Sequence, residues 1–233
     1  MLLSSEELGE SPLLPALAIL TSAALYATLP SRFIAGPSSG LFSAVRWIVP
    51  ALTILLLVAL VASAPHGRLV QSVGLRARRV HIGRRIAVLA VTAVVSAANA
   101  ASIVLTVHLL VRGAQAQASQ LLRAGIHMWC MNVLVFALWF WELDNGGPLA
   151  RSAAPPVGRD FLFPQQTLEE FTSARWQPRF LDYLYLSFTN ATAFSPTDAM
   201  PLSRWAKMLM LVEAAASLLL AIMVAARAVN ILK

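Results

Sequence analysis

The fold is decided by one stretch near the C-terminal end of the chain, PRFLDYLYLSFTNATAFSPTDAM at residues 178–200. Its central run, FLDYLYLSF at residues 180–188, is strongly apolar but only nine residues long. A helix needs about 20 mostly apolar residues to cross a bilayer, so this run is too short to span. It is also too apolar for a free loop. The pattern predicts a re-entrant half-helix buried in protein, followed by a non-helical return through residues 194–197.

Long apolar segments lie on both sides of this stretch and continue towards the N-terminus. Each contains roughly the 20 apolar residues that a spanning helix requires. We therefore expect an all-α, polytopic membrane protein with five transmembrane helices and one re-entrant, pore-type half-helix. The expected spans are residues 13–34, 45–61, 86–111, 121–141 and 203–232.

The segments divide the chain into two expected regions. Residues 1–112 form an N-terminal membrane region of three helices with a basic loop at 65–85. Residues 121–233 form a C-terminal module. The parts of this module are an outer helix at 121–141, a loop at 142–177, the re-entrant helix and return segment at 178–200, and an inner helix at 203–232.

Composition supports a membrane protein and excludes most other classes. Apolar residues make up 58% of the chain and charged residues only 12%, which is about half the usual share of a soluble domain. The net charge of +7 comes from basic residues that flank apolar runs, as in membrane proteins, and we expect no nucleic-acid partner. The arginine-rich loop at 65–85 is expected on the cytoplasmic side, with the arginine-containing loop at 142–177 on that same side.

Six residues of the decisive stretch stand at the spacing of a known motif. They are Asp182, Tyr185, Ser187, Phe188, Thr192 and Asp198. The stretch resembles the pore loop of tetrameric potassium-channel-like proteins, in which a pore helix of the form Phe-x-Asp-x-x-Tyr-x-Ser-Phe leads to a Thr and then to Thr-Val-Gly-Tyr-Gly-Asp. The chain also looks like a family of bacterial integral membrane proteins of unknown function with the same order of helices and loops. This resemblance implies a pore module that assembles as a homotetramer in the bacterial inner (plasma) membrane.

The filter-like segment departs from the potassium-channel pattern. Thr192 is retained, but the next five residues are Ala193, Phe194, Ser195, Pro196 and Thr197. Ser195 and Thr197 replace both glycines, which permit the backbone angles of a carbonyl-lined filter. Potassium selectivity is therefore not expected. A wide or nonselective pore, a hydrophobic gate formed by Phe194, and a plugged remnant without conduction remain as alternatives.

Three polar residues lie inside the expected spans. Glu213 is a carboxyl group in an apolar helix, and it either has a function or pairs with Arg204, Arg123 or a backbone donor near the pore-like loop. Asn99 lies on a polar face that either lines a path or packs against another helix. His127 lies three residues before Cys130, but no further donors complete a metal site, so no metal is expected. Asp182 is expected to cap the short helix, and Asp198 to brace the loop.

The residues contain no motif for nucleophilic, metalloprotease, phosphate-binding or dinucleotide chemistry, so we expect neither an enzyme nor a cofactor. The leading hypothesis is an oligomeric, ion-channel-like pore that is not potassium-selective, with the bilayer, ions and further copies of the chain as its partners. The alternative is a non-conducting membrane scaffold that binds partner proteins or lipids. Close packing of inner helices through small residues, including Ala214, Ala215 and Ser217, is expected to hold the oligomer together.

Overall fold

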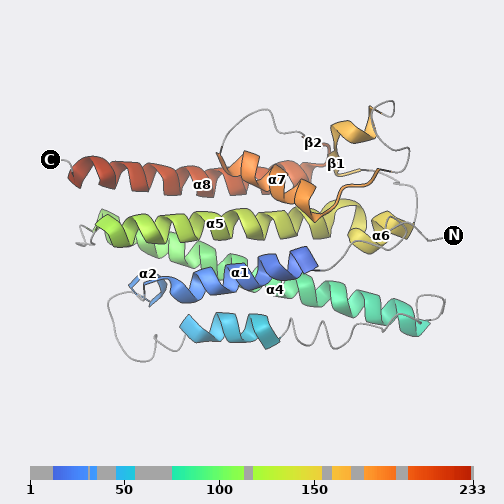
Figure 1. Cartoon of the computed structure of the whole chain (residues 1–233), viewed down its shortest axis with the longest axis horizontal. Coiled ribbons are helices and arrows are strands. Elements are labelled where there is room, and N and C mark those ends of the chain that lie inside the picture. Colours follow the sequence, from blue (N-terminus) through green and yellow to red (C-terminus); the bar gives the residue numbers. More distant parts are fainter. Residues whose placement is uncertain are drawn as a thin grey trace. The chain divides into compact units, whose positions relative to one another are not determined.

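The computed structural model describes residues 13–30, 32–35, 46–55, 75–112, 118–153, 159–168, 176–192 and 199–231. These residues are mostly helical (Figure 1). The chain divides into two compact units. One unit combines Met1–Ala18 with Trp129–Lys233, and the other is Ile19–Met128.

Three helices are long and apolar enough to cross a membrane. They are α4 (Leu75–Val111), α5 (Ala118–Leu143) and α8 (Arg204–Ile231), and each contains an apolar stretch of more than 20 residues. The bounds of α5 and α8 lie within three residues of the spans expected at 121–141 and 203–232. The structure therefore has the features of a membrane protein.

The helix in the first expected span is shorter than expected, and the second expected span is described only in part. Helix α1 (Leu13–Thr28) has 16 residues and ends two residues before Pro30, because a proline disfavours helical angles in the residue that precedes it. The four-residue helix α2 (Arg32–Ala35) follows. In the second segment the structure describes the helix Arg46–Leu55, and residues 56–61 lie outside the described ranges. Spanning by these two segments stays a prediction.

The basic segment expected as a loop is partly helical. Helix α4 already begins at Leu75, so the arginines between 76 and 85 belong to its first three turns. Arginine and leucine favour helices, and at 37 residues α4 is about 55 Å long, much longer than the bilayer core of about 30 Å. The helix therefore has room for a charged end beyond the apolar region.

The unit Ile19–Met128 contains α4 and the helices before it. Helix α2 packs against α4, and the Arg46 guanidinium donates a hydrogen bond to the carbonyl oxygen of Leu29. Leu29, Phe33 and Met128 are buried in its core.

The expected loop at 142–177 is more structured than its composition indicates. Helix α5 ends at Leu143, and the chain then turns away at Asn145, Gly146 and Gly147, whose φ angles are 50°, 81° and 96°. The short elements that follow are a 3-10 turn at Asp144–Gly146, α6 (Pro148–Ala153), strand β1 (Phe161–Leu162) and a 3-10 turn at Pro164–Gln166. β1 pairs antiparallel with β2 (Met200–Pro201), with Phe161 opposite Pro201. The loop thus holds the chain that returns after the pore-like stretch.

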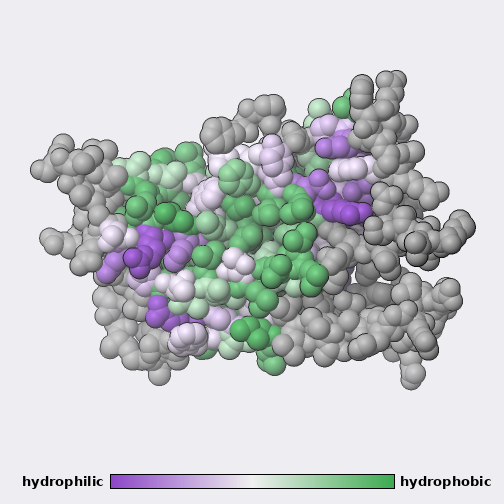
Figure 2. Space-filling view, viewed as in Figure 1, coloured by the Kyte–Doolittle hydropathy of each residue, from purple (hydrophilic) through white to green (hydrophobic). Residues whose placement is uncertain are grey.

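Within this unit the decisive stretch forms α7 (Phe180–Thr192), which lies against α8 (Figure 1). Figure 2 shows hydrophilic side chains around the start of α7 and apolar side chains along the neighbouring parts of α5 and α8. This arrangement places the site described below.

Candidate functional site

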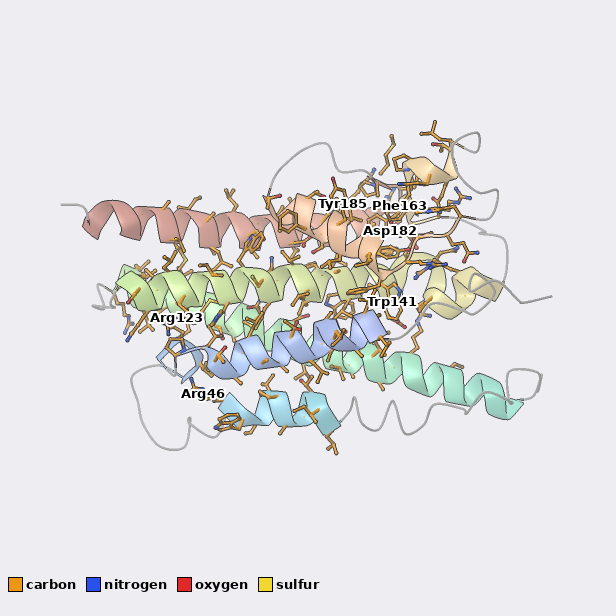
Figure 3. All side chains as sticks on the ribbon, viewed as in Figure 1. Arg46, Arg123, Trp141, Phe163, Asp182 and Tyr185 are labelled. Atoms are coloured by element: carbon orange, nitrogen blue, oxygen red, sulfur yellow. The ribbon has the colours of Figure 1, made fainter. Side chains whose placement is uncertain are left out.

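The first turn of α7 is capped by Asp182. Its Oδ2 atom accepts a hydrogen bond of 2.7 Å from the backbone N–H of Arg179, the residue before the helix. This bond satisfies a backbone donor that has no partner within the helix. Burial raises the pKa of Asp182, while the Arg179 N–H and the Arg179 charge act against that shift. Figure 3 shows Asp182 at the start of α7 and Tyr185 further along the helix.

A buried hydrogen bond between Tyr183 and Asp144 holds the same end of α7 against the end of α5. The Tyr183 hydroxyl donates a hydrogen bond to Oδ2 of Asp144, and Oδ1 of Asp144 accepts from the backbone N–H of Phe161 at 3.3 Å. The Arg151 guanidinium lies 5.1 Å from the centre of the Tyr183 ring, and its Nη1 donates to the carbonyl oxygens of Trp141 and Asp144. All of these side chains are at least nine-tenths buried. The start of α7 is therefore held from several directions.

Aromatic rings surround this anchor. Phe161 and Phe163 meet the Tyr183 ring edge-to-face, with centroids 6.5 and 5.4 Å away, and Trp141 packs on Phe180 at 6.0 Å. Edge-to-face contacts of this kind add about 0.5–1.5 kcal/mol each beyond the burial of their area. The end of the unit where α5 stops and α8 starts is thus closely packed.

Asp160 secures the return of the chain towards α8. Its Oδ1 atom accepts a hydrogen bond from the indole N–H of Trp205 at 2.8 Å, and its Oδ2 accepts from the backbone N–H of Asn145 at 3.0 Å. The carbonyl oxygen of Asp160 accepts from the N–H of Leu202 at 2.8 Å. The first residues of α8 are therefore fixed at the same end as the start of α7.

The C-terminal half of α7 meets Glu213, which is completely buried about a third of the way along α8. Glu213 lies nine residues after the start of α8, which is about 14 Å along that helix. Its Oε1 atom is hydrogen bonded to the Ser187 hydroxyl, and its Oε2 accepts from Nδ2 of Asn190 at 2.7 Å. Asn190 also donates to the carbonyl oxygen of Met210 at 2.9 Å. The partners of the carboxyl group are thus neutral side chains of α7, and not the arginines considered from the sequence.

A residue of α5 completes the cluster. Nδ2 of Asn132 donates to the carbonyl oxygen of Glu213 at 3.2 Å and to Oγ of Ser217 at 2.9 Å. The Ser187 Oγ also lies 2.7 Å from the carbonyl oxygen of Val133 on α5. We call Asn132, Ser187, Asn190, Glu213 and Ser217 the central polar cluster.

The sequence pattern did not predict Asn132 or Asn190 as members of the cluster, although an amide inside an apolar helix is a signal that could have found both. Ser217, which we expected in the packing between inner helices of an oligomer, is only 1% exposed and accepts a hydrogen bond from Asn132 of α5. Ala215 is exposed.

The remaining pore-helix residues lie on different faces of α7. Tyr185 and Phe188 are 52% and 45% exposed, and Phe188 contacts the Trp129 ring edge-to-face at 5.7 Å. The Thr192 hydroxyl donates to carbonyl oxygens of its own helix. The filter-like residues Ala193, Phe194, Ser195, Pro196, Thr197 and Asp198 lie outside the described residues, so their expected roles stay predictions.

Asn99 and His127 lie in or beside the α4–α5 contact of the other unit. Nδ2 of Asn99 donates to the carbonyl oxygen of Met128 at 3.3 Å, which favours the interpretation of Asn99 as a helix-packing residue. The buried Nδ1 of His127 has no hydrogen-bond partner among the described residues. Within the same described ranges, no group of three His, Cys, Asp or Glu side chains lies close enough to hold a metal ion.

Comparison of the chain with protein-family models, with curated proteins and with solved structures gave no match.

Proposed function

We propose that the chain forms an oligomeric, channel-like pore that is not selective for potassium, in the inner (plasma) membrane of a bacterium. Five spans and four copies around one axis complete the proposed architecture. The support comes from the C-terminal module, in which a short helix enters the unit between two long helices and ends in its middle.

The observation that carries this proposal is how far α7 extends into the unit alongside α5 and α8. The first turn of α7 is bonded to Asp144 at the end of α5, whereas Asn190 near its last turn is bonded to Met210 and Glu213, the seventh and tenth residues of α8. At 13 residues, α7 is about 20 Å long, too short to cross a core of about 30 Å.

The chain then returns to the end from which α7 started. Seven residues after Thr192, Ala199 leads into β2, which pairs with β1 beside the start of α8. A short helix that goes in and a chain that comes back out at the same end support a re-entrant segment.

A re-entrant segment places polar, non-helical backbone inside the membrane. Non-helical backbone is tolerated there only inside protein or along a water-filled cavity. Copies of this module around an axis would enclose such a cavity with their return segments. Ser195 and Thr197 replace the glycines that a carbonyl-lined potassium filter requires, so the proposed pore discriminates weakly among ions.

Ion flux through the purified protein in liposomes tests the proposal. Phe194 is the bulkiest residue of the filter-like segment, and a hydrophobic constriction closes a pore by excluding water. Phe194→Ala should therefore raise ion leak severalfold above the wild-type protein. Leu181→Ala is the matched control, because Leu181 is an exposed apolar residue at the opposite end of α7.

The second candidate is the non-conducting scaffold, and the exposed face of α7 favours it. Leu181, Tyr185 and Phe188 form an apolar stripe that is 57%, 52% and 45% exposed and that a partner protein or lipid could cover. If wild-type and Phe194→Ala liposomes both stay as tight as empty ones while the oligomer is intact, the pore proposal fails and the scaffold replaces it.

A further inference from the structure

The central polar cluster contains more hydrogen-bond contacts than hydrogens, unless Glu213 carries a proton. Ser187 has one hydroxyl hydrogen, yet its Oγ makes hydrogen-bond contacts with the carbonyl oxygen of Val133 and with Oε1 of Glu213. Both of those oxygens are acceptors when the carboxyl is ionised, so one contact would place lone pairs against lone pairs. A hydroxyl cannot donate to both with one hydrogen.

The other donors of the cluster are already in use. The two Nδ2 hydrogens of Asn190 go to the carbonyl oxygen of Met210 and to Oε2 of Glu213. The two Nδ2 hydrogens of Asn132 go to the carbonyl oxygen of Glu213 and to Ser217. One additional hydrogen on Oε1 of Glu213 completes the set, because Glu213 then donates to Ser187 and Ser187 donates to Val133.

We infer that Glu213 is a proton-binding site in the middle of the membrane and that the bound proton fastens α7 to α8. The ligand is a proton, held between the Glu213 carboxyl and the Ser187 hydroxyl. The site lies inside one protomer and does not depend on whether the chain conducts ions, so this inference goes beyond the proposed function.

The surroundings of the carboxyl group fit a neutral acid. Among the described residues, the groups that hydrogen bond to its two oxygens are uncharged, and a carboxylate without a positive partner is costly inside a low-dielectric environment. Along α8 the nearest cation is Lys207, six residues or about 9 Å towards the helix start. Besides Glu213, the titratable groups on the helices of this unit are Cys130 and Glu142 on α5, Asp144 on the 3-10 turn, Arg151 on α6, Asp182, Tyr183 and Tyr185 on α7, and Arg204, Lys207 and Arg227 on α8.

Loss of the proton changes the attachment of α7. The contact between Oε1 and Ser187 becomes a competition between Glu213 and Val133 for one hydrogen, and a full negative charge is left at the centre of the unit. Water or movement of α7 must then supply the missing stabilisation. The filter-like segment follows the last turn of α7 directly in the sequence, so the proton acts on the helix that precedes that segment.

Infrared spectroscopy of the purified protein in lipid tests for the proton directly. The wild-type spectrum at neutral pH should contain a C=O stretching band of a protonated carboxylic acid, and Glu213→Gln should remove it. Ser217→Ala is the matched control, because Ser217 belongs to the same cluster but touches neither carboxyl oxygen. Ser187→Ala should shift the band without removing it. A wild-type spectrum without the band, or a band that persists in Glu213→Gln, overturns the inference.

Distance measurements between spin labels test the role of the proton. Cysteines for the labels replace Tyr185 on α7 and Met208 on α8, both more than half exposed, in a Cys130→Ser background. In the labelled protein that retains Glu213, raising the pH until the infrared band disappears should lengthen or broaden the distribution of distances between the two labels. In the labelled Glu213→Gln variant, this distance should stay the same at every pH, since the Gln amide donates to Ser187 and its oxygen accepts from Asn190. If the wild-type distance stays unchanged after the band is lost, the proton does not fasten α7.

Discussion

Replacing Tyr183 with phenylalanine isolates one hydrogen bond at the start of α7. Tyr183 is completely buried, and its hydroxyl donates to Oδ2 of Asp144, which is itself only 3% exposed. Phenylalanine keeps the ring, so the contacts with Arg151, Phe161 and Phe163 remain. The variant therefore removes the hydroxyl and little else.

The expected loss of stability follows from what the substitution leaves behind. Asp144 keeps the bond from the Phe161 N–H at 3.3 Å, but its Oδ2 becomes a buried acceptor without the Tyr183 donor. Leaving a buried acceptor without its partner costs about 1–3 kcal/mol. With a change of roughly 2–4 °C per kcal/mol for a chain of this size, Tyr183→Phe should unfold at a temperature lower by roughly 2–12 °C.

Thermal unfolding in detergent, followed by circular dichroism, measures this effect. Tyr185→Phe is the matched control, because Tyr185 lies two residues further on the same helix and is 52% exposed. The free energy of unfolding of Tyr185→Phe should differ from that of the wild type by no more than about 0.5 kcal/mol, as for other substitutions of exposed residues. Equal unfolding temperatures for Tyr183→Phe and the wild type would refute the anchoring role of the hydroxyl. A loss seen only in Tyr185→Phe would mean that α7 presents the opposite face to α5.

Two further predictions concern topology and assembly. Single cysteines that replace Ser72 and Ser152, in a Cys130→Ser background, should react equally with a membrane-impermeant thiol reagent. The reason is that the arginines near both positions are expected on the same side of the membrane. Labelling of one position without the other would mean that α4 and α5 do not both span. Ala215→Phe should dissociate the oligomer in detergent, because Ala215 is an exposed small residue of α8 where helices can approach closely. An unchanged mass in light scattering would place the subunit contact elsewhere.

The local pattern of the sequence was sufficient for the long helices and the short one. Apolar length predicted α5 and α8 within three residues at each bound, and the nine-residue run at 180–188 lies inside α7. These predictions succeed because burial in lipid depends on the hydropathy of consecutive residues. For the first two expected spans the structure describes only the helices Leu13–Thr28 and Arg46–Leu55, so spanning by these segments stays a prediction.

Charge and loop composition were less informative about local structure. The arginines before 85 indicated a loop, whereas they extend α4, because arginine is compatible with a helix in water as well as with a loop. The proline- and glycine-rich region after α5 contains β1, whose partner β2 lies almost 40 residues later. Pairing over such a separation depends on the folded chain and leaves no local signal.

The sequence by itself determined that Glu213 is a carboxyl group inside an apolar helix, and that it needs a partner or a proton. Only the tertiary structure decided which groups meet it, because Ser187 comes from α7 and Asn132 from α5, 26 and 81 residues away from it in the chain. Hydropathy predicts which segments enter the membrane, since that is a property of each segment alone. The contacts of Glu213, at its carboxyl and at its backbone carbonyl, depend on how three helices rotate and slide against one another, and those quantities are set by packing.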